Sequence, residues 1–342
     1  MERPDLEMLE LLSSPALAVE NGTVTYTNQL AAGLAVVGSA IADYLGSDLD
    51  EYRQLESGTL YLTFTTEGCP FGASVTRMAG YDIFVLDPQQ SQNELHTIAL
   101  AARELRKSLT SVFIAADNLP ATPQAGQLNR GLHQMLRLAG NLSGISQQNQ
   151  GRQELRDIAA VIREIFEKAA VLAEAANIRI LFDCFPEEAV GLVDSERLER
   201  AIYNILSNAI KFTPTGGTVT GSLTRHGNRL RLSVRDCGSG VPDDVLGSVF
   251  TRHQRPLTLE DSRYGMGLGM VLVREAAIAH GGTVLIQRIP EGGTCVTMTL
   301  TLRKSIGSTL RCPIIVPDYA GGFDHGMIEL ADVLPPKVYE SK

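Results

Sequence analysis

Short apolar runs separated by turns fill residues 1 to about 88, a pattern typical of strands in a small mixed domain. Asn21-Gly22 stands between two alternating segments and predicts a β-hairpin. Further strand-like runs cover residues 59–64 and 81–86, and Asp87-Pro88 closes the region. We therefore predict a first domain over residues 1–88.

Two helical periods come next. Apolar residues recur at spacings of three and four in residues 91–119 and again in residues 128–145, with a proline-containing turn between them. Such a hairpin leaves an apolar stripe uncovered, and a second copy of the chain covers it most simply as a four-helix bundle. We predict a dimerisation hairpin over residues 89–150 and expect a homodimer.

Residues 151–303 mix strand and helix patterns. A helical series begins at Gln153, strand-like runs follow at 178–182 and 189–193, and a helix runs from about Ser195 to Phe212. The remaining strand-like runs are residues 218–224, 229–235, 284–288 and 294–302. This order favours an α/β sandwich over a doubly wound parallel sheet and makes the whole chain a multi-domain α+β protein. Residues 304–342 form an extension to which we assign no role.

Composition narrows the choice of partners and compartment. The net charge of −9 supplies no basic field for nucleic acid. The chain has neither a signal peptide pattern nor a run of about 18 apolar residues, so we expect no membrane span. Its five cysteines are scattered without a Cys-x-x-Cys pair, which fits a reducing compartment. We expect a cytoplasmic protein.

A polar face on the helix over residues 195–212 carries the first candidate chemistry. Asn204, Asn208 and Lys211 follow one another at spacings of four and three, so they share that face. Two carboxamides can bind hydrated Mg²⁺ or phosphate oxygens, and a lysine adds a positive charge. This chemistry suits a triphosphate, whereas two helical asparagines taken alone are more often solvated surface.

Two glycine-containing motifs complete the set. Asp236 ends a strand-like run before Gly238 and Gly240, so its carboxylate can accept a hydrogen bond from a purine amino group while the backbone approaches the ring. Residues 265–269 read Gly-Met-Gly-Leu-Gly and precede an apolar helix whose first amides can hold phosphate. The chain has neither a Rossmann fingerprint nor a P-loop at this point.

The order and spacing of these three motifs resemble the ATP-binding domain that histidine kinases share with DNA gyrase and a heat-shock chaperone, over about residues 155–303. The resemblance implies ATP and Mg²⁺ as cofactors, with Asn208 on the metal, Asn204 near the phosphates or a metal-bound water, and Lys211 on the phosphate tail. Gyrase-like members carry a glutamate where this chain has Asn204, so we expect no hydrolytic base. A phenylalanine-led box and a lid over the nucleotide fall at Phe250 and residues 251–255. The implied nucleotide-site residues are Asn204, Asn208, Lys211, Phe212, Asp236, Gly238, Gly240, Phe250, Gly265, Gly267, Leu268 and Gly269.

The phosphate acceptor departs from the family. Histidine kinases read His-Glu-Leu-Arg-Thr-Pro-Leu on the first helix of the hairpin, and this chain reads Arg-Glu-Leu-Arg-Lys-Ser-Leu over residues 103–109. A guanidinium has no lone pair with which to attack phosphorus, so we expect no phosphorylation at Arg103. Glu104 remains as the neighbour that would assist an acceptor. His96 lies two turns earlier on nearly the same face and is an alternative acceptor, while His133 is a weaker one.

Residues 1–88 resemble a short PAS sensor domain in the run Pro15 to Gly22, in Tyr26-Thr-Asn28 and in their place before the hairpin. The whole chain thus resembles a cytoplasmic sensor histidine kinase, an ATP-dependent phosphotransferase of two-component signalling with a response regulator as partner. Two alternatives stay open. One is an anti-sigma-type serine/threonine kinase, against which the long hairpin argues, and the other is a non-catalytic scaffold gated by ATP.

Overall fold

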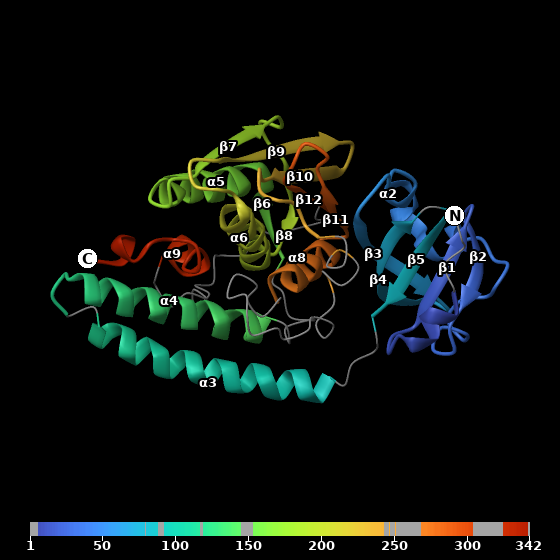
Figure 1. Cartoon of the computed structure of the whole chain (residues 1–342), viewed down its shortest axis with the longest axis horizontal. Coiled ribbons are helices and arrows are strands. Elements are labelled where there is room, and N and C mark those ends of the chain that lie inside the picture. Colours follow the sequence, from blue (N-terminus) through green and yellow to red (C-terminus); the bar gives the residue numbers. More distant parts are fainter. Residues whose placement is uncertain are drawn as a thin grey trace.

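The computed structural model contains a β-rich N-terminal region, a long helical hairpin, and a larger region of strands and helices (Figure 1). The hairpin lies along one side of the larger region, and the N-terminal region lies at one end. No helix in the described part of the chain is both long enough and apolar enough to cross a bilayer. The structure describes residues 6–78, 80–87, 92–116, 119–144, 153–242, 246, 250, 268–303 and 324–340, with backbone alone at residues 7, 92–99 and 144.

The N-terminal region is an antiparallel sheet in the order β2-β1-β5-β4-β3. Its first hairpin turns at Asn21 and Gly22, whose φ angles of 51° and 78° are those that an Asn-Gly turn favours. The predicted hairpin and strands are therefore confirmed, while β4 had not been predicted. The elements are η1 (Leu6–Leu11), β1 (Ala16–Glu20), β2 (Thr23–Thr27), α1 (Ala42–Leu45), η2 (Gly46–Asp48), α2 (Leu49–Arg53), β3 (Thr59–Thr66), β4 (Cys69–Met78) and β5 (Tyr81–Leu86).

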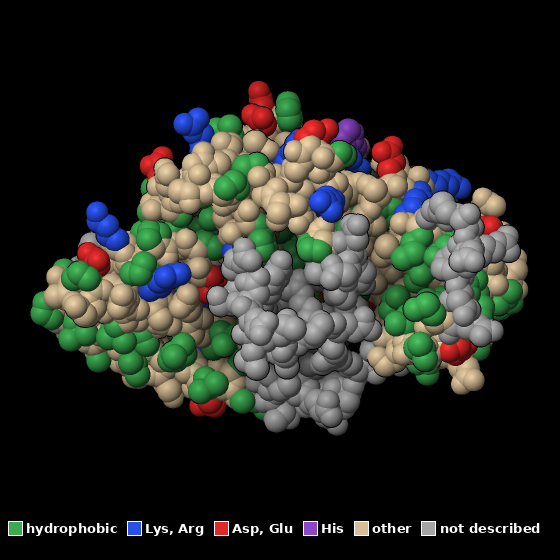
Figure 2. All heavy atoms as spheres, viewed as in Figure 1, with side chains coloured by type: hydrophobic (Ala, Val, Ile, Leu, Met, Phe, Trp, Pro, Cys, Tyr) green, Lys and Arg blue, Asp and Glu red, His purple; other side chains and the backbone are tan. Residues whose placement is uncertain are grey.

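Helices α3 (Gln92–Ala116) and α4 (Pro123–Gly144) form the predicted hairpin. Phe113, Leu132 and Leu136 are buried where the two helices meet. Other apolar side chains stay exposed, and Figure 2 shows hydrophobic side chains gathered at its lower left, over these helices. A four-helix bundle with a second copy stays a prediction. The exposed apolar residues of the hairpin and its turn are Leu100, Leu105, Val112, Ile114, Leu119, Leu128, Met135 and Leu138.

The larger region is an α/β sandwich, as predicted. Its strands run in the order β11-β12-β10-β9-β7, and only the β7 and β9 pair is parallel among the described strands of this sheet. The elements are β6 (Glu154–Asp157), α5 (Ile158–Glu174), β7 (Arg179–Cys184), β8 (Val190–Val193), α6 (Ser195–Phe212), β9 (Thr218–His226), β10 (Arg229–Arg235), α8 (Leu268–Ala279), β11 (Val284–Arg288) and β12 (Thr294–Thr301).

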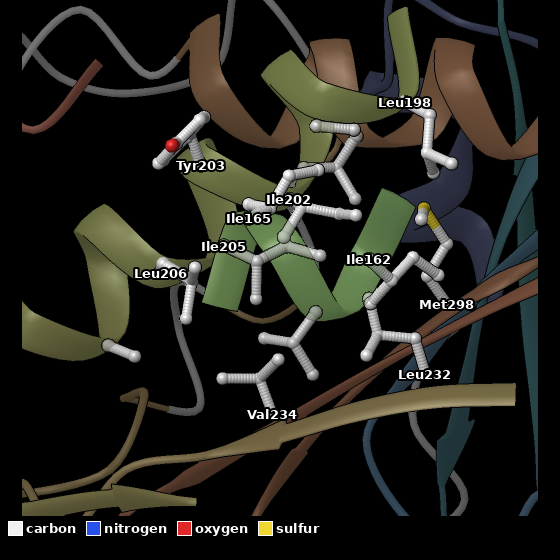
Figure 3. Packing of buried hydrophobic residues seen from close by; sticks show 14 of the residues in the cluster. Ile162, Ile165, Leu198, Ile202, Tyr203, Ile205, Leu206, Leu232, Val234 and Met298 are labelled. Atoms are coloured by element: carbon white, nitrogen blue, oxygen red, sulfur yellow. The ribbon is translucent and has the colours of Figure 1, made fainter. Parts of the chain in front are cut away.

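The core of the sandwich lies between the helices and one face of the sheet. Figure 3 shows Ile162 of α5 and Ile202 of α6 among the side chains that pack against Leu232 of β10. These three residues are 0–1% exposed. Burial of side chains of this size stabilises the fold by about 1.5–3 kcal/mol each. The apolar face of α6 is thus fixed against the sheet, which leaves its polar face for the hairpin side.

The helix predicted from Gln153 begins later than expected. Residues 154–157 form β6, which pairs with β8, and α5 starts only at Ile158. Asp157 explains the boundary, because its Oδ1 accepts hydrogen bonds from the Ala159 amide at 3.1 Å and the Ala189 amide at 2.9 Å. A carboxylate in this position caps a helix and ends the strand before it.

The five-stranded sheet of the N-terminal region and the five-stranded sheet of the sandwich join into one sheet of ten strands. β3 of the N-terminal region pairs antiparallel with β11 of the sandwich, with Tyr61 opposite Val284 and Thr59 opposite Ile286. Gly58 permits this approach, since a methyl group there would lie 2.1 Å from the Ile286 carbonyl oxygen. Backbone pairing therefore connects the region that resembles a sensor domain directly to the sandwich.

A buried arginine strengthens this joint. Arg274 of α8 donates from Nη1 to the Phe250 carbonyl at 2.8 Å and forms an ion pair with Asp87 at 3.1 Å. Its guanidinium also lies 4.8 Å from the centre of the Tyr61 ring, and that ring packs on Phe250. Although burial alone would lower the pKa of Arg274, the anionic partners around it raise that pKa further above its ordinary value. The charge on this arginine is therefore retained.

The C-terminal segment, defined here as residues 324–340, lies between the hairpin and the sandwich (Figure 1). It contains α9 (His325–Glu329) and η3 (Pro336–Tyr339). Ile328 belongs to the apolar cluster of the hairpin, and Leu330 and Leu334 belong to the core of the sandwich. This segment, for which the sequence suggested no role, thus bridges two cores.

We expect His280 to make folding stability depend on pH. Its Nε2 accepts from the Asp194 amide at 3.0 Å, and its Nδ1 faces the Ala276 carbonyl at 2.7 Å, an arrangement that fits the neutral ring. Burial lowers the pKa of His280 below its ordinary value of 6.5. As the pH drops, His280 is protonated in the unfolded chain before it is protonated in the folded chain. The free energy of unfolding should therefore fall as the pH drops below about 6.5.

Urea unfolding at pH 7.5 and pH 5.5 measures this effect. His280→Gln should reduce the loss of stability at the lower pH, and the same change at exposed His226 should leave it unaltered. Equal pH dependence in both variants would contradict the assignment. The buried His133, whose pKa burial also lowers, supplies a residual dependence of the same sign in either variant.

Candidate functional site

Helix α6 presents the first group of candidate residues. Asp194 caps its start by accepting from the Arg197 amide at 3.1 Å, and Thr213 with the following Pro214 ends it. The predicted polar face is present: Asn204, Asn208 and Lys211 all line one cavity of about 570 Å³. A cavity of this volume is in the range of small-molecule sites.

Asp236 follows β10 and is 6% exposed. Its Oδ1 accepts from the Gly238 amide at 2.8 Å and the Thr294 amide at 3.0 Å. Burial raises the pKa of this carboxyl above its ordinary value, and the hydrogen bonds from the Gly238 amide and from the amide and side chain of Thr294 oppose the rise. Asp236 therefore lines the cavity with a carboxylate that these hydrogen bonds hold in place.

Glycines bring the three motifs together. A methyl group on Gly238 would lie 2.4 Å from the Phe212 carbonyl oxygen, so the second motif contacts the end of α6. A methyl group on Gly269 would lie 2.9 Å from Asn204 Oδ1, so the third motif contacts the middle of α6. Side chains at either position would force the motifs apart.

Apolar residues form another part of the cavity wall. Val234, Val296 and Ile286 are neighbours across β10, β12 and β11, and all three line the cavity. They lie next to Asp236, which follows Val234 by two positions. Aliphatic side chains beside one buried carboxylate suit a flat apolar ring that carries a hydrogen-bond donor.

The other wall comes from the hairpin, which sequence reasoning did not anticipate. The α4 residues Gln134, Arg137 and Asn141 line the cavity, and so does Asp332 of the C-terminal segment. Arg137 Nη2 donates to Asn204 Oδ1 at 3.1 Å, and Asn204 Nδ2 donates to the Arg200 carbonyl at 2.8 Å. Asn204 is 2% exposed as a result. No local pattern in the sequence signals this long-range contact.

Other expected site residues lie elsewhere. Phe250 is 1% exposed and packs on Tyr61 in the core, so the structure does not bring its ring into the cavity wall. Phe212, Gly240 and Leu268 line the cavity, whereas Gly238 is not among the lining residues and contacts the Phe212 carbonyl. Gly265, Gly267 and the expected lid over residues 251–255 lie outside the described residues.

The expected acceptor region lies on α3. Arg103 and Glu104 are exposed, and Glu104 forms an ion pair with Lys107 at 2.6 Å. His96 falls within α3, but its side chain is outside the described part. His133 is buried with its ring between Phe113 and Tyr339, so it is a core residue and not an accessible nucleophile.

Comparisons with known proteins agree with this geometry. Residues 193–304 match the family of histidine kinase-, DNA gyrase B- and HSP90-like ATPases. Adaptive-response sensory kinase SasA of Synechocystis sp. is 28% identical over 238 residues, which cover 63% of this chain and 61% of that protein. Sensor protein KdpD of Escherichia coli is 27% identical over 263 residues, which cover 73% of this chain and 28% of that protein.

A solved structure extends the likeness in fold. The crystal structure of full-length ShkA in complex with AMPPNP matches this chain with a TM-score of 0.50 and 22% sequence identity. The match covers 64% of this chain and 47% of the ShkA chain. At this identity the likeness concerns the fold alone.

The sandwich, its cavity and the three converging motifs define an ATP-binding domain of the ATPase class that histidine kinases share with gyrase and HSP90. Within that class, the sensory kinases matched here support a sensor histidine kinase family ATP-binding domain in this chain. The chain spans 61% or less of the length of the two curated relatives described above.

Proposed function

We propose that this protein is a signal-transduction protein of the sensor histidine kinase family that binds Mg-ATP in the cavity between α6, the sheet and α4. The observation that carries the proposal is the meeting of Asn208, Lys211 and Asp236 in one cavity. The Asp236 carboxylate would accept a hydrogen bond from the adenine amino group, and the aliphatic side chains of Val234, Val296 and Ile286 would contact the ring.

The phosphate end of the nucleotide meets α6 and the start of α8. Lys211 supplies positive charge, and the amides at Leu268 and Gly269 begin a helix whose positive end attracts phosphate. The half-buried Asn208 is the proposed Mg²⁺ ligand through its amide oxygen. Mg²⁺ keeps several waters and takes few protein oxygens beside substrate phosphates, so a single carboxamide fits it. The bound ion would neutralise phosphate charge.

We expect no phosphoryl transfer to residue 103. Arg103 stays protonated and cannot attack phosphorus, and Glu104 is already paired with Lys107. We propose that the protein either transfers phosphate to another acceptor, with His96 as the candidate, or signals through nucleotide binding alone. The exposed apolar residues along α3 and α4 support a homodimer, and a response regulator is the proposed partner.

Nucleotide binding tests the first part of the proposal. Asn208→Ala should weaken Mg²⁺-dependent ATP binding by about tenfold or more, because a carboxamide oxygen near the metal is lost. Titration with a fluorescent ATP analogue, with and without Mg²⁺, measures the effect. Asn228→Ala, in the exposed β9–β10 turn, is the matched control and should bind like the native protein. Equal affinity in both variants would exclude the metal site.

Incubation with γ-labelled ATP separates the kinds of activity. Acid-labile label that disappears in His96→Ala supports a displaced acceptor. Acid-stable label on a partner protein indicates a serine/threonine kinase instead. Binding without any label indicates a scaffold gated by ATP.

A further inference from the structure

The C-terminal segment holds α4 against the nucleotide cavity. Arg130 of α4 donates from Nε to the Ala331 carbonyl and from Nη2 to the Asp332 carbonyl, each at 3.0 Å. Asn129 of α4 donates to the Tyr339 carbonyl at 3.2 Å. Since the same segment contributes Leu330 and Leu334 to the sandwich core, it binds the hairpin to the sandwich.

A group of charges lies under this segment. Glu329 is 1% exposed and stands between Arg137 of α4 and Arg200 of α6, with each Nε 3.6 Å from a carboxylate oxygen. Asp332 accepts a hydrogen bond from Arg137 Nη1 at the cavity wall. Arg137 therefore faces two carboxylates from the C-terminal segment while its Nη2 reaches Asn204.

These charges have the wrong signs for a magnesium polyphosphate. A metal ion needs oxygen ligands, but Asn204 Oδ1 already accepts from a cation. Phosphates need cations, but Arg137 is already paired with Glu329 and Asp332, and Asp332 itself adds negative charge to the cavity wall. The contacts of Arg137 with Asn204 and Asp332 therefore compete with the metal ion for Asn204 and with the phosphates for Arg137.

The contacts of Arg137 with Asp332 and Glu329 can break at a low cost in free energy. The Asp332 side chain is 47% exposed, so it can leave Arg137 without dismantling a core. Glu329 Oε2 and Arg137 Nε face each other beyond hydrogen-bonding distance, and neither atom has a hydrogen-bond partner among the described residues. The contact between Arg137 Nε and Glu329 Oε2, which is buried but not hydrogen-bonded, therefore adds little stability to this arrangement.

We propose that residues 324–340 and α4 form an autoinhibitory strap, which keeps Arg137 on Asn204 and Asp332 in the cavity until magnesium nucleotide displaces them. This inference rests on the proposed nucleotide site but goes beyond it, since the strap lies outside the matched residues 193–304. Nucleotide occupancy is thereby coupled to the position of the hairpin.

Binding of a fluorescent ATP analogue with Mg²⁺ to the full chain tests the strap. Arg137→Gln and Asp332→Asn should each bind the nucleotide at least about fivefold more tightly than the native protein, the lower end of ordinary coupling between sites. Glu340→Gln is the matched control, because it removes one negative charge from the same segment beside Gly126, at the other end of α4. Its affinity should equal that of the native protein.

The alternatives predict different results. If Arg137 were a direct phosphate ligand, Arg137→Gln would bind more weakly, and the strap would be refuted. Unchanged affinity in both variants, with a native protein that binds, would refute the strap and leave the proposed nucleotide site intact. If neither the native protein nor the variants bind, the nucleotide site itself is refuted, and the strap with it.

Hydrogen exchange of the full chain gives a second measurement. If residues 324–340 had only a structural role, nucleotide would leave the exchange rates of their amides unchanged. The Ile328 amide donates to the Asp324 carbonyl at 3.2 Å and the Leu330 amide donates to the Gly326 carbonyl at 2.9 Å. Saturation with magnesium nucleotide should make these amides exchange at least about fivefold faster, because the strap opens. Unchanged or slower exchange would overturn the proposal.

Discussion

Asp236→Asn should weaken ATP binding by about ten- to a hundredfold, the cost of losing a hydrogen bond to a charged acceptor. The asparagine oxygen can still accept from the Gly238 and Thr294 amides, so the loop should keep its shape. Its amide group then turns a donor toward the adenine amino group, which is itself a donor. Isothermal titration calorimetry measures the loss, and the ratio of GTP to ATP affinity should rise because guanine offers an acceptor there.

The control for this variant is Asp183→Asn, which removes one charge from the exposed side of β7 in the same sandwich. ATP affinity should also fall as the pH is lowered through the raised pKa of Asp236, because the protonated carboxyl no longer accepts from adenine. Asp236→Asn should lack this dependence. An affinity for ATP that matches that of the control would show that Asp236 does not contact the nucleotide.

Arg274→Met should lower the free energy of unfolding by about 3–5 kcal/mol, the usual cost of removing one partner of a buried ion pair. The variant loses the bond to the Phe250 carbonyl and leaves Asp87 without its cation. The Tyr61 ring also loses the guanidinium that lies over it. Urea unfolding followed by far-ultraviolet circular dichroism measures the change.

Arg53→Met is the matched control for the stability measurement. Arg53 pairs with Asp50 at 3.8 Å, and both side chains are largely exposed, so its loss should cost no more than about 1 kcal/mol. A similar small loss in Arg274→Met would mean that the joint between the N-terminal region and the sandwich is maintained by strand pairing alone.

Helix α6 was predictable because the residues that determine its start, its end and its buried face lie within the helix or next to it. Asp194 marks its start, Pro214 and Gly216 follow its end, and its apolar spacing identifies the buried face. The observed bounds, Ser195–Phe212, are those that the sequence predicted. The helix predicted for residues 154–157 was wrong because their structure depends on a distant segment. Leu155 fits a helical series, but pairing with β8 makes the segment a strand. Pairing across a distance overrides a short local pattern.

The candidate site divides in the same way. Asn208, Lys211 and Asp236 could be proposed from the sequence because their motifs have characteristic spacing, and all three line the cavity. Arg137 and Asp332 were missed because their role depends on how the hairpin and the C-terminal segment pack against the sandwich. Phe250 was placed in the site by resemblance alone, and its burial beside Tyr61 depends on the pairing of β3 with β11.

The sheet shared by the two regions determines how this protein can be dissected. In the intact chain, β3 and β11 protect each other's backbone edges. A fragment cut near residue 88 would carry one bare strand edge, and the remaining fragment would carry the other. Such edges recruit strands from other molecules, so the separate pieces are liable to aggregate even where each retains its own core. Experiments on the N-terminal region or on the sandwich should therefore begin with point variants of the uncut polypeptide.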